Sequence, residues 1–133
     1  MKIVAMIPAR YNSARLPGKL MMDLVGIPLI LRTYYSAKKS GLFNEVYVIT
    51  DSKIIFELIK KNGGIAFMSS KKHDSGSDRI AEFVNDIEAD LILNVQGDEP
   101  FIDKPSLKKL IGIFKNDSQC KIELASLMQT INN

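Results

Sequence analysis

Residues 3–19 read IVAMIPARYNSARLPGK, a stretch in which an apolar run leads directly into a stiff basic loop. The five apolar residues 3–7 have the continuity of a strand that is covered on both faces of a sheet. Two prolines, Pro8 and Pro17, argue against a helix in the segment that follows. The chain therefore begins with a predicted buried strand and a loop whose three cations have no acidic residue between them.

The same kind of apolar run recurs along the chain. Further β-branched or apolar runs are found at residues 46–50, 65–68, 91–95 and 124–128, with helical patterns between them. Strands that alternate with helices indicate βαβ crossovers and a mainly parallel sheet. The sequence therefore predicts a single α/β domain over residues 1–133.

Turn and capping residues predict where the helices begin and end. Pro28 is expected at the first helical position of one helix, and Gly41 just after its end. Ser52 is expected to cap a second helix that ends at Gly63, and Pro105 to open a fourth. The third helix is predicted from apolar side chains with helical spacing, after a start that resembles a capping box, Ser75-x-x-Asp78. Those side chains are Ile80, Phe83, Val84 and Ile87.

Composition excludes several classes of protein. The net charge is only +3, and the basic residues fall in scattered pairs late in predicted helices, which does not indicate a nucleic-acid-binding stripe. Cys120 is the only cysteine, so neither an intrachain disulfide nor a Cys-rich zinc site can form. No run approaches the roughly 20 apolar residues of a membrane helix, and Arg10 interrupts the opening run too early for a signal peptide. We expect a cytoplasmic protein with no nucleic-acid or membrane partner.

The basic loop after the first strand is a candidate polyphosphate site. Arg10 and Arg15 offer forked hydrogen bonds to phosphate oxygens, and Lys19 adds a mobile point charge. Gly18 would let the backbone approach a ligand closely. The loop matches neither G-x-x-x-x-G-K-[ST] nor G-x-G-x-x-G. From spacing alone, a solvated loop with incidental cations stays open as the alternative.

Three more segments follow predicted strands and should reach the same edge of a parallel sheet, where ligands bind. They are Thr50-Asp51-Ser52 after the second strand, and the loops at 69–79 and 96–100 after the third and fourth. The loop QGDEP at 96–100 holds two carboxylates, of which Asp98 is the expected Mg²⁺ ligand because Gly97 frees the backbone before it. The alternative is a tight turn with exposed acids. The loop KHDSGSDR at 72–79 could read a base or ribose with free N–H groups, or be a helix cap alone. There is no Ser/His/Asp signature that would support nucleophilic hydrolysis.

Three ordered motifs make the chain resemble the sugar cytidylyltransferases, and among them the CMP-Kdo synthetases. They are IPARYxSxRLPGK at 7–19, HxSGSDRIAE at 73–82 and NVQGDEPFI at 94–102. The resemblance covers essentially the whole chain, but only about the amino-terminal half of the family's usual extent. It therefore implies a domain that is truncated relative to the family.

The resemblance implies a three-layer α/β/α Rossmann-like fold of the nucleotide-diphospho-sugar transferase type. It also implies the reaction of CTP with 3-deoxy-manno-octulosonate (Kdo) to CMP-Kdo and pyrophosphate, with Mg²⁺, for lipopolysaccharide synthesis. Arg10, Arg15 and Lys19 would hold the triphosphate, with Arg10, Lys19 and Asp98 catalytic and Asp98 on the metal. The remaining nucleotide contacts would come from Pro8, Ala9, Ser75, Gly76, Arg79 and Gln96.

The resemblance leaves two alternatives to Kdo activation. The sugar could be another 2-keto acid sugar, or the chain could be a CTP-binding fragment without catalysis. A homodimer is expected for the full-length family. The chain departs from the family at Ser75-Gly76-Ser77, where Thr-Gly-Thr is common, and at Gly26-Ile27-Pro28, where Gly-Lys-Pro is common.

Overall fold

The computed structural model describes residues 1–11, 17–69 and 76–117. The chain divides into two compact units, Met1–Ile102 and Asp103–Asn133. The prediction of a single domain over residues 1–133 stays a prediction. In the described ranges, no helix has the length and apolar character needed to cross a bilayer.

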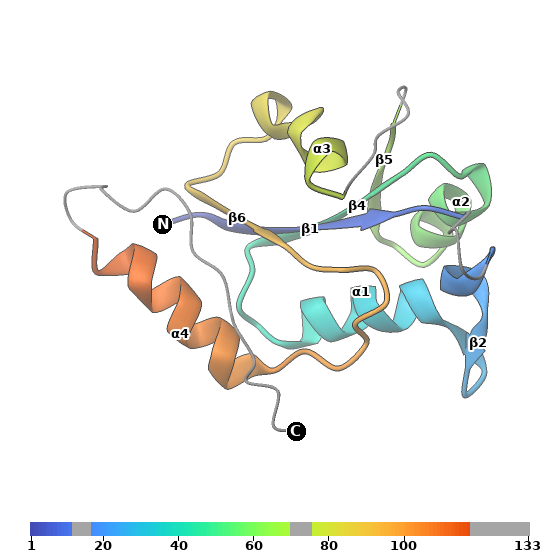
Figure 1. Cartoon of the computed structure of the whole chain (residues 1–133), viewed down its shortest axis with the longest axis horizontal. Coiled ribbons are helices and arrows are strands. Elements are labelled where there is room, and N and C mark those ends of the chain that lie inside the picture. The colour runs from blue at the N-terminus through green and yellow to red at the C-terminus, as the bar shows by residue number, and fades with distance from the viewer. Residues whose placement is uncertain (12–16, 70–75, 118–133) are drawn as a thin grey trace, which may run out of the picture. The chain divides into compact units, whose positions relative to one another are not determined.

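The first unit is built around a parallel sheet of four strands (Figure 1). β1 (Ile3–Ala9) lies at its centre and pairs in parallel with β4 (Glu45–Thr50) on one side and β6 (Leu91–Asn94) on the other. β5 (Ile65–Met68) pairs with the far side of β4. Four predicted strands and their parallel arrangement are therefore confirmed, and the fifth, at 124–128, falls outside the described residues.

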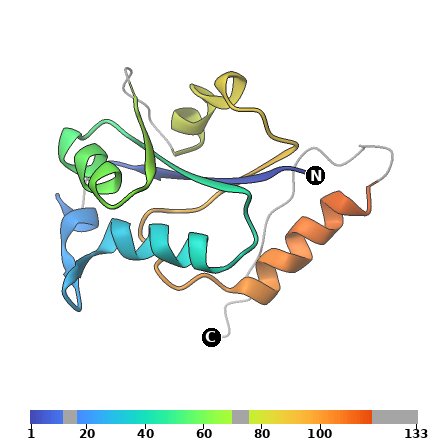
Figure 2. The ribbon, with the colours of Figure 1, turned by 180° about the vertical axis from the view of Figure 1, so that it is seen from behind.

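Helices cover both faces of this sheet. α1 (Leu29–Lys39) and α2 (Lys53–Lys61) pack on one face, and α3 (Gly76–Ala81) with the short 3-10 helix η2 (Val84–Asp86) lies over the other (Figures 1 and 2). This arrangement confirms the three-layer α/β/α prediction.

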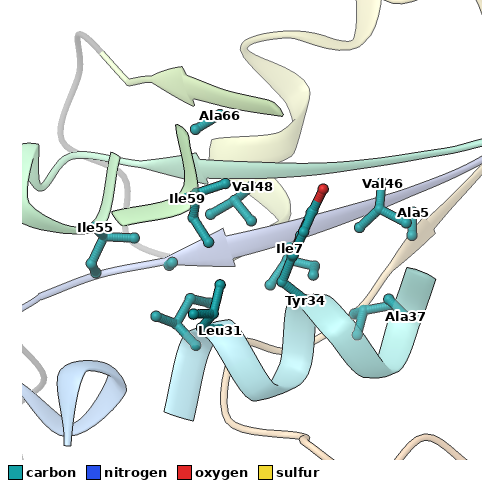
Figure 3. Close-up of a cluster of buried hydrophobic side chains, with 13 residues drawn as sticks. Ala5, Ile7, Leu31, Tyr34, Ala37, Val46, Val48, Ile55, Ile59 and Ala66 are labelled. Carbon is teal, nitrogen blue, oxygen red and sulfur yellow. The ribbon is translucent and has the colours of Figure 1, made fainter. Parts of the chain in front are cut away.

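Both faces of β1 are fully buried, because its alternating side chains enter two different clusters. Ala5 and Ile7 face α1 and α2, where they meet Tyr34 and Ile59 (Figure 3). Met6 belongs to the cluster under α3. A strand that is apolar at every position is what a two-sided layer requires.

The predicted helix ends are mostly confirmed. Ser52 caps α2, since its Oγ accepts a hydrogen bond from the Ile55 N–H at 3.4 Å. Gly41 and Gly63 follow the C-caps of α1 and α2 with φ of 72° and 81°. One detail is wrong: Pro28 is the N-cap of α1 instead of its first helical residue, because it is also the last residue of a short strand.

The fourth predicted helix is α4 (Lys104–Lys115), which belongs to the second unit. It begins one residue before Pro105, and Asp103 caps it by accepting the Ser106 N–H at 3.3 Å. A bond from the Ser106 hydroxyl, with that N–H, lowers the pKa of the Asp103 carboxyl. The predicted opening at Pro105 is therefore correct to within one residue.

The third predicted helix is shorter than its apolar pattern suggested. α3 ends at Ala81, and the Phe83 N–H donates to the Ile80 carbonyl, three residues back, at 3.0 Å. Side chains three residues apart share a face in a 3-10 turn as well as in an α-helix. Ile80 and Phe83 therefore reach the same apolar cluster without a continuous helix to Ile87.

A β-hairpin between the basic loop and α1 was not predicted. It joins β2 (Asp23–Leu24) to β3 (Ile27–Pro28) through the two residues Val25 and Gly26, whose φ angles are 54° and 84°. Arg32 of α1 holds the turn, donating to the Leu24 carbonyl at 2.9 Å and to the Val25 carbonyl at 2.7 Å. The sequence lacks the Asn-Gly or Asp-Gly pair that usually marks such a turn.

Replacement of Val25 by Asn should stabilise the protein by about 1 kcal/mol, because a β-branched residue in left-handed backbone is strained and Asn tolerates that conformation. Val25 is 88% exposed, so its side chain contributes little packing that could be lost. Urea unfolding would measure the gain. Val25→Thr is the matched control: it is polar but still β-branched, and an equal gain from Thr would show that backbone strain is not the cause.

Candidate functional site

The carboxyl ends of the parallel strands bring several loops to one edge of the sheet. Ala9 of β1 is level with Thr50 of β4, and Thr50 is level with Met68 of β5. On the other side of β1, β6 is paired up to Asn94. The basic loop and the QGDEP loop therefore leave the same edge, as the sequence predicts.

An ion pair joins these two loops. Lys19 Nζ lies 3.0 Å from Asp98 Oδ2, and each side chain is about half exposed, at 45% and 44%. An exposed pair of this kind adds little stability, so it is better explained by what the two groups can bind. The predicted meeting of the basic and acidic loops is confirmed for these two residues.

The backbone before Lys19 is closed by a tight turn. The Gly18 N–H donates to the Tyr11 carbonyl at 2.7 Å, and Gly18 has φ of 75°. Lys19 then begins the 3-10 helix η1 (Lys19–Met21). Glycine is favoured at this position because it adopts the left-handed conformation without strain. The turn brings the chain back to the sheet edge at Lys19.

The QGDEP loop is fixed from beneath by α1. Thr33 is fully buried, and its hydroxyl donates to the Gly97 carbonyl at 2.7 Å. A Cβ on Gly97 would stand 3.2 Å from the Pro8 carbonyl oxygen and from Leu20. The residue before Asp98 therefore has little freedom to move. Sequence reasoning missed Thr33, and no local pattern could have revealed a contact across 64 positions.

A second ion pair lies beyond β4, at the same edge. Arg79 Nη2 lies 3.4 Å from Asp51 Oδ2. The Arg79 side chain is only 2% exposed, whereas that of Asp51 is 42% exposed. Within the described residues, Arg79 Nη1 is buried and makes no hydrogen bond. Asp51 was not among the predicted site residues.

The other predicted site residues are distributed as follows. Pro8 and Ala9 are the buried end of β1, and Arg10 is exposed just beyond it. Gln96 is exposed, and its Nε2 donates to Asn94 Oδ1 at 3.2 Å. Gly76 is the first residue of α3, while Arg15 and Ser75 lie outside the described residues. The ligand-binding roles of all these residues stay predictions.

One carboxylate in the QGDEP loop fits a magnesium ion that is held mainly by a bound ligand. Asp98 is half exposed at the sheet edge, and the described ranges contain no group of three or more His, Cys, Asp or Glu that could enclose a metal. Mg²⁺ commonly takes one or two carboxylates and completes its shell with waters and substrate phosphates. The donor set therefore suits a metal that arrives with a polyphosphate.

Glu99 keeps its proton to a higher pH than an ordinary glutamate does. Partial burial, and then the adjacent Asp98 charge, raise the pKa of Glu99 above its ordinary value of 4.5. An acid that resists ionisation is a poorer cation ligand, which supports Asp98 as the metal ligand of the pair.

Comparisons with known proteins agree with this fold and these motifs. The sequence profile of the family described as Cytidylyltransferase matches residues 4–132. The 3-deoxy-manno-octulosonate cytidylyltransferase of Flavobacterium johnsoniae is 56% identical over 133 residues, which are 100% of this chain and 54% of that protein. The chain thus spans about half the length of the curated relatives it matches.

Two solved structures are also similar. One is a CMP:2-keto-3-deoxy-manno-octonic acid synthetase complexed with CTP, with a TM-score of 0.82 and 40% identity, covering 88% of this chain and 48% of that one. The other is a cytidylyltransferase from Leptospira borgpetersenii, with a TM-score of 0.75 and 27% identity, covering 89% of this chain and 50% of that one.

Replacement of Asp98 by Asn should lower the pKa of Glu99, because the neighbouring negative charge is removed, but burial should keep it above its ordinary value of 4.5. A carbon-detected NMR titration of Glu99 would measure the change. A raised folded-state pKa means that the Glu99 contribution to stability is complete below about pH 4.5 and is lost as pH rises through the folded pKa. Asp98→Asn should reduce that loss, and an unchanged Glu99 titration would contradict the assigned coupling.

Proposed function

Because the chain belongs to the cytidylyltransferase family, we propose that it provides the CTP-binding part of an enzyme that activates Kdo. The reaction is CTP + Kdo → CMP-Kdo + pyrophosphate. The chain spans 54% of the length of its Flavobacterium johnsoniae relative, so this is a proposal for the part of the reaction that these residues can serve.

The observation that carries the proposal is the ion pair of Lys19 with Asp98. It places a cation and a metal-competent carboxylate together at the carboxyl edge of a parallel sheet, where such folds bind nucleotides. Arg10 is exposed just beyond the end of β1, at the same edge of the sheet. A triphosphate needs this combination, because its negative charge must be balanced by both side chains and a metal.

In the proposed reaction, the anomeric hydroxyl oxygen of the sugar forms a bond to the α-phosphorus of CTP. The bond from that phosphorus to the pyrophosphate oxygen breaks, and the hydroxyl proton is lost to solvent. Arg10 and Lys19 bind the β- and γ-phosphates and stabilise the charge that grows on the leaving pyrophosphate. Asp98 would hold Mg²⁺, which when bound supplies charge neutralisation and orientation of the phosphates.

The nucleoside end of CTP is assigned to the residues around α3 and to Gln96, with backbone groups of Pro8 and Ala9 beside them. We also propose that the full-length enzyme is cytoplasmic and forms a homodimer. Another 2-keto acid sugar is the alternative substrate, because the described residues include no assigned sugar contact.

Pyrophosphate release from CTP should require both Kdo and Mg²⁺ when the chain is assayed with a coupled phosphate readout. Parallel reactions with a sialic-type sugar decide between the two substrate classes. If CTP raises the melting temperature but no sugar yields pyrophosphate, the function of the chain is limited to CTP binding. If CTP neither binds nor reacts, the proposed function is wrong.

Replacement of Lys19 by Met should slow pyrophosphate release by roughly a hundredfold to a thousandfold, equivalent to about 2.7–4 kcal/mol, because a cation that stabilises the charge on the leaving group is lost. Lys61→Met is the matched control: Lys61 is exposed in the last turn of α2, which follows β4 and therefore returns to the opposite edge of the sheet. The same charge change there should leave the rate unaltered. A loss of less than about tenfold in Lys19→Met would show that Lys19 is only a surface charge.

A further inference from the structure

The ion pair of Arg79 with Asp51 differs in character from the pair of Lys19 with Asp98. Lys19 is half exposed, whereas the Arg79 side chain is almost completely withdrawn from solvent. We propose that Asp51 is a positioning residue, which holds the Arg79 guanidinium so that Nη1 donates to an uncharged acceptor on a bound nucleoside. The acceptor is a base carbonyl, a ring nitrogen or a ribose oxygen. This inference rests on the proposed binding of CTP.

The burial of Arg79 is the first support. Removing a guanidinium from water is costly, and the cost is normally recovered by several hydrogen bonds with good geometry. Among the described residues, Arg79 has one charged contact, at 3.4 Å, to a carboxylate that is itself 42% exposed. The pairing in the described part of the chain is therefore incomplete.

The second support is the unsatisfied donor. Arg79 Nη1 is buried and has no acceptor among the described residues. Buried donors without partners are rare in folded proteins because each one loses its bonds to water without replacement. A donor that is dry and unpaired before binding can bond a ligand without first being stripped of water.

The position of the pair in the sheet is the third support. Asp51 directly follows β4, and in the order β5-β4-β1-β6 that strand is two places from β6, which leads to Asp98. Two inter-strand spacings amount to roughly 10 Å. A single nucleotide can therefore have its phosphates at Lys19 and its nucleoside near Arg79.

The charge balance within the pair of Arg79 and Asp51 favours a nucleoside over the phosphates as its ligand. Asp51 already balances the charge of Arg79, so the pair together presents little net charge to a polyanion. A planar guanidinium that is fixed by one carboxylate still offers a directed N–H to a neutral oxygen or nitrogen. The exposed cations at Arg10 and Lys19 are better suited to phosphates, which keep much of their hydration.

The experiment compares the binding of CTP with that of inorganic triphosphate, using the whole chain and calorimetry. Asp51→Asn should weaken CTP binding by about tenfold, as expected when a charged hydrogen bond is misplaced, and leave triphosphate binding within about twofold of the original protein. Lys19→Met should weaken the binding of both ligands. Arg79→Lys keeps the charge but lacks Nη1, so it should behave like Asp51→Asn. It is the variant to use if Asp51→Asn does not fold.

Ser69→Ala is the matched structural control. The Ser69 hydroxyl donates to Glu82 Oε2 at 2.7 Å, so it joins the end of β5 to the residue after α3. If Asp51 acted only by holding this part of the fold in place, Ser69→Ala would weaken CTP binding as much as Asp51→Asn does. The proposal expects Ser69→Ala to keep its selectivity between CTP and triphosphate.

A readout on the unmodified protein completes the test. Nitrogen-15 NMR of the Arg79 guanidinium should show shifted Nη resonances when CTP is added, and no such shift with triphosphate. An unmoved Arg79 resonance with CTP bound, or equal losses of CTP and triphosphate binding in Asp51→Asn, would overturn the assignment of Asp51 while leaving the proposed function standing. A chain that binds no CTP would overturn both.

Discussion

The central position of β1 is the constraint on which the rest of the structure depends. It has a parallel partner on each side and a helical layer on each face, a position that β4 shares, and it joins β4 to β6. All seven of its residues are buried. Because both neighbours run parallel to it, every loop that leaves their carboxyl ends emerges at one edge. The convergence of distant motifs is thus a consequence of backbone pairing, and it requires no special contact between them.

This constraint explains why much of the fold could be predicted from sequence. A strand that is buried on both faces must be apolar at nearly every position, and the runs that became β1, β4, β5 and β6 have that property. Helix ends were also predictable, because capping by Ser52 and the left-handed conformation of Gly41 depend only on residues nearby in the sequence. The third helix was overextended because apolar spacing of three residues does not distinguish an α-helix from a 3-10 turn.

The parts of the site that escaped prediction are the ones that depend on distant contacts. Lys19 and Asp98 were predictable because Lys19 lies in a loop with three cations and Asp98 lies in a loop with two carboxylates. Thr33 is an ordinary helix residue until the fold brings it to the Gly97 carbonyl. In the sequence, Asp51 is simply the residue before the helix-capping Ser52. Only the fold brings its carboxylate to the buried Arg79. The strained turn at Val25 is held by Arg32 of the following helix, which is likewise invisible in a local pattern.

Burial divides the candidate site into two halves with different demands on their surroundings. Lys19 can move, because its side chain is half exposed, and its pair with Asp98 can open at small cost when a polyanion arrives. Arg79 cannot adapt in this way, since it is enclosed and directed by a single carboxylate. A mobile cation tolerates the changing geometry of phosphates during transfer, whereas a fixed donor can discriminate one arrangement of acceptors from another. A site for a nucleoside triphosphate needs both kinds of group, and the order of the strands places the loops that carry Asp51 and Asp98 two strands apart along the same edge.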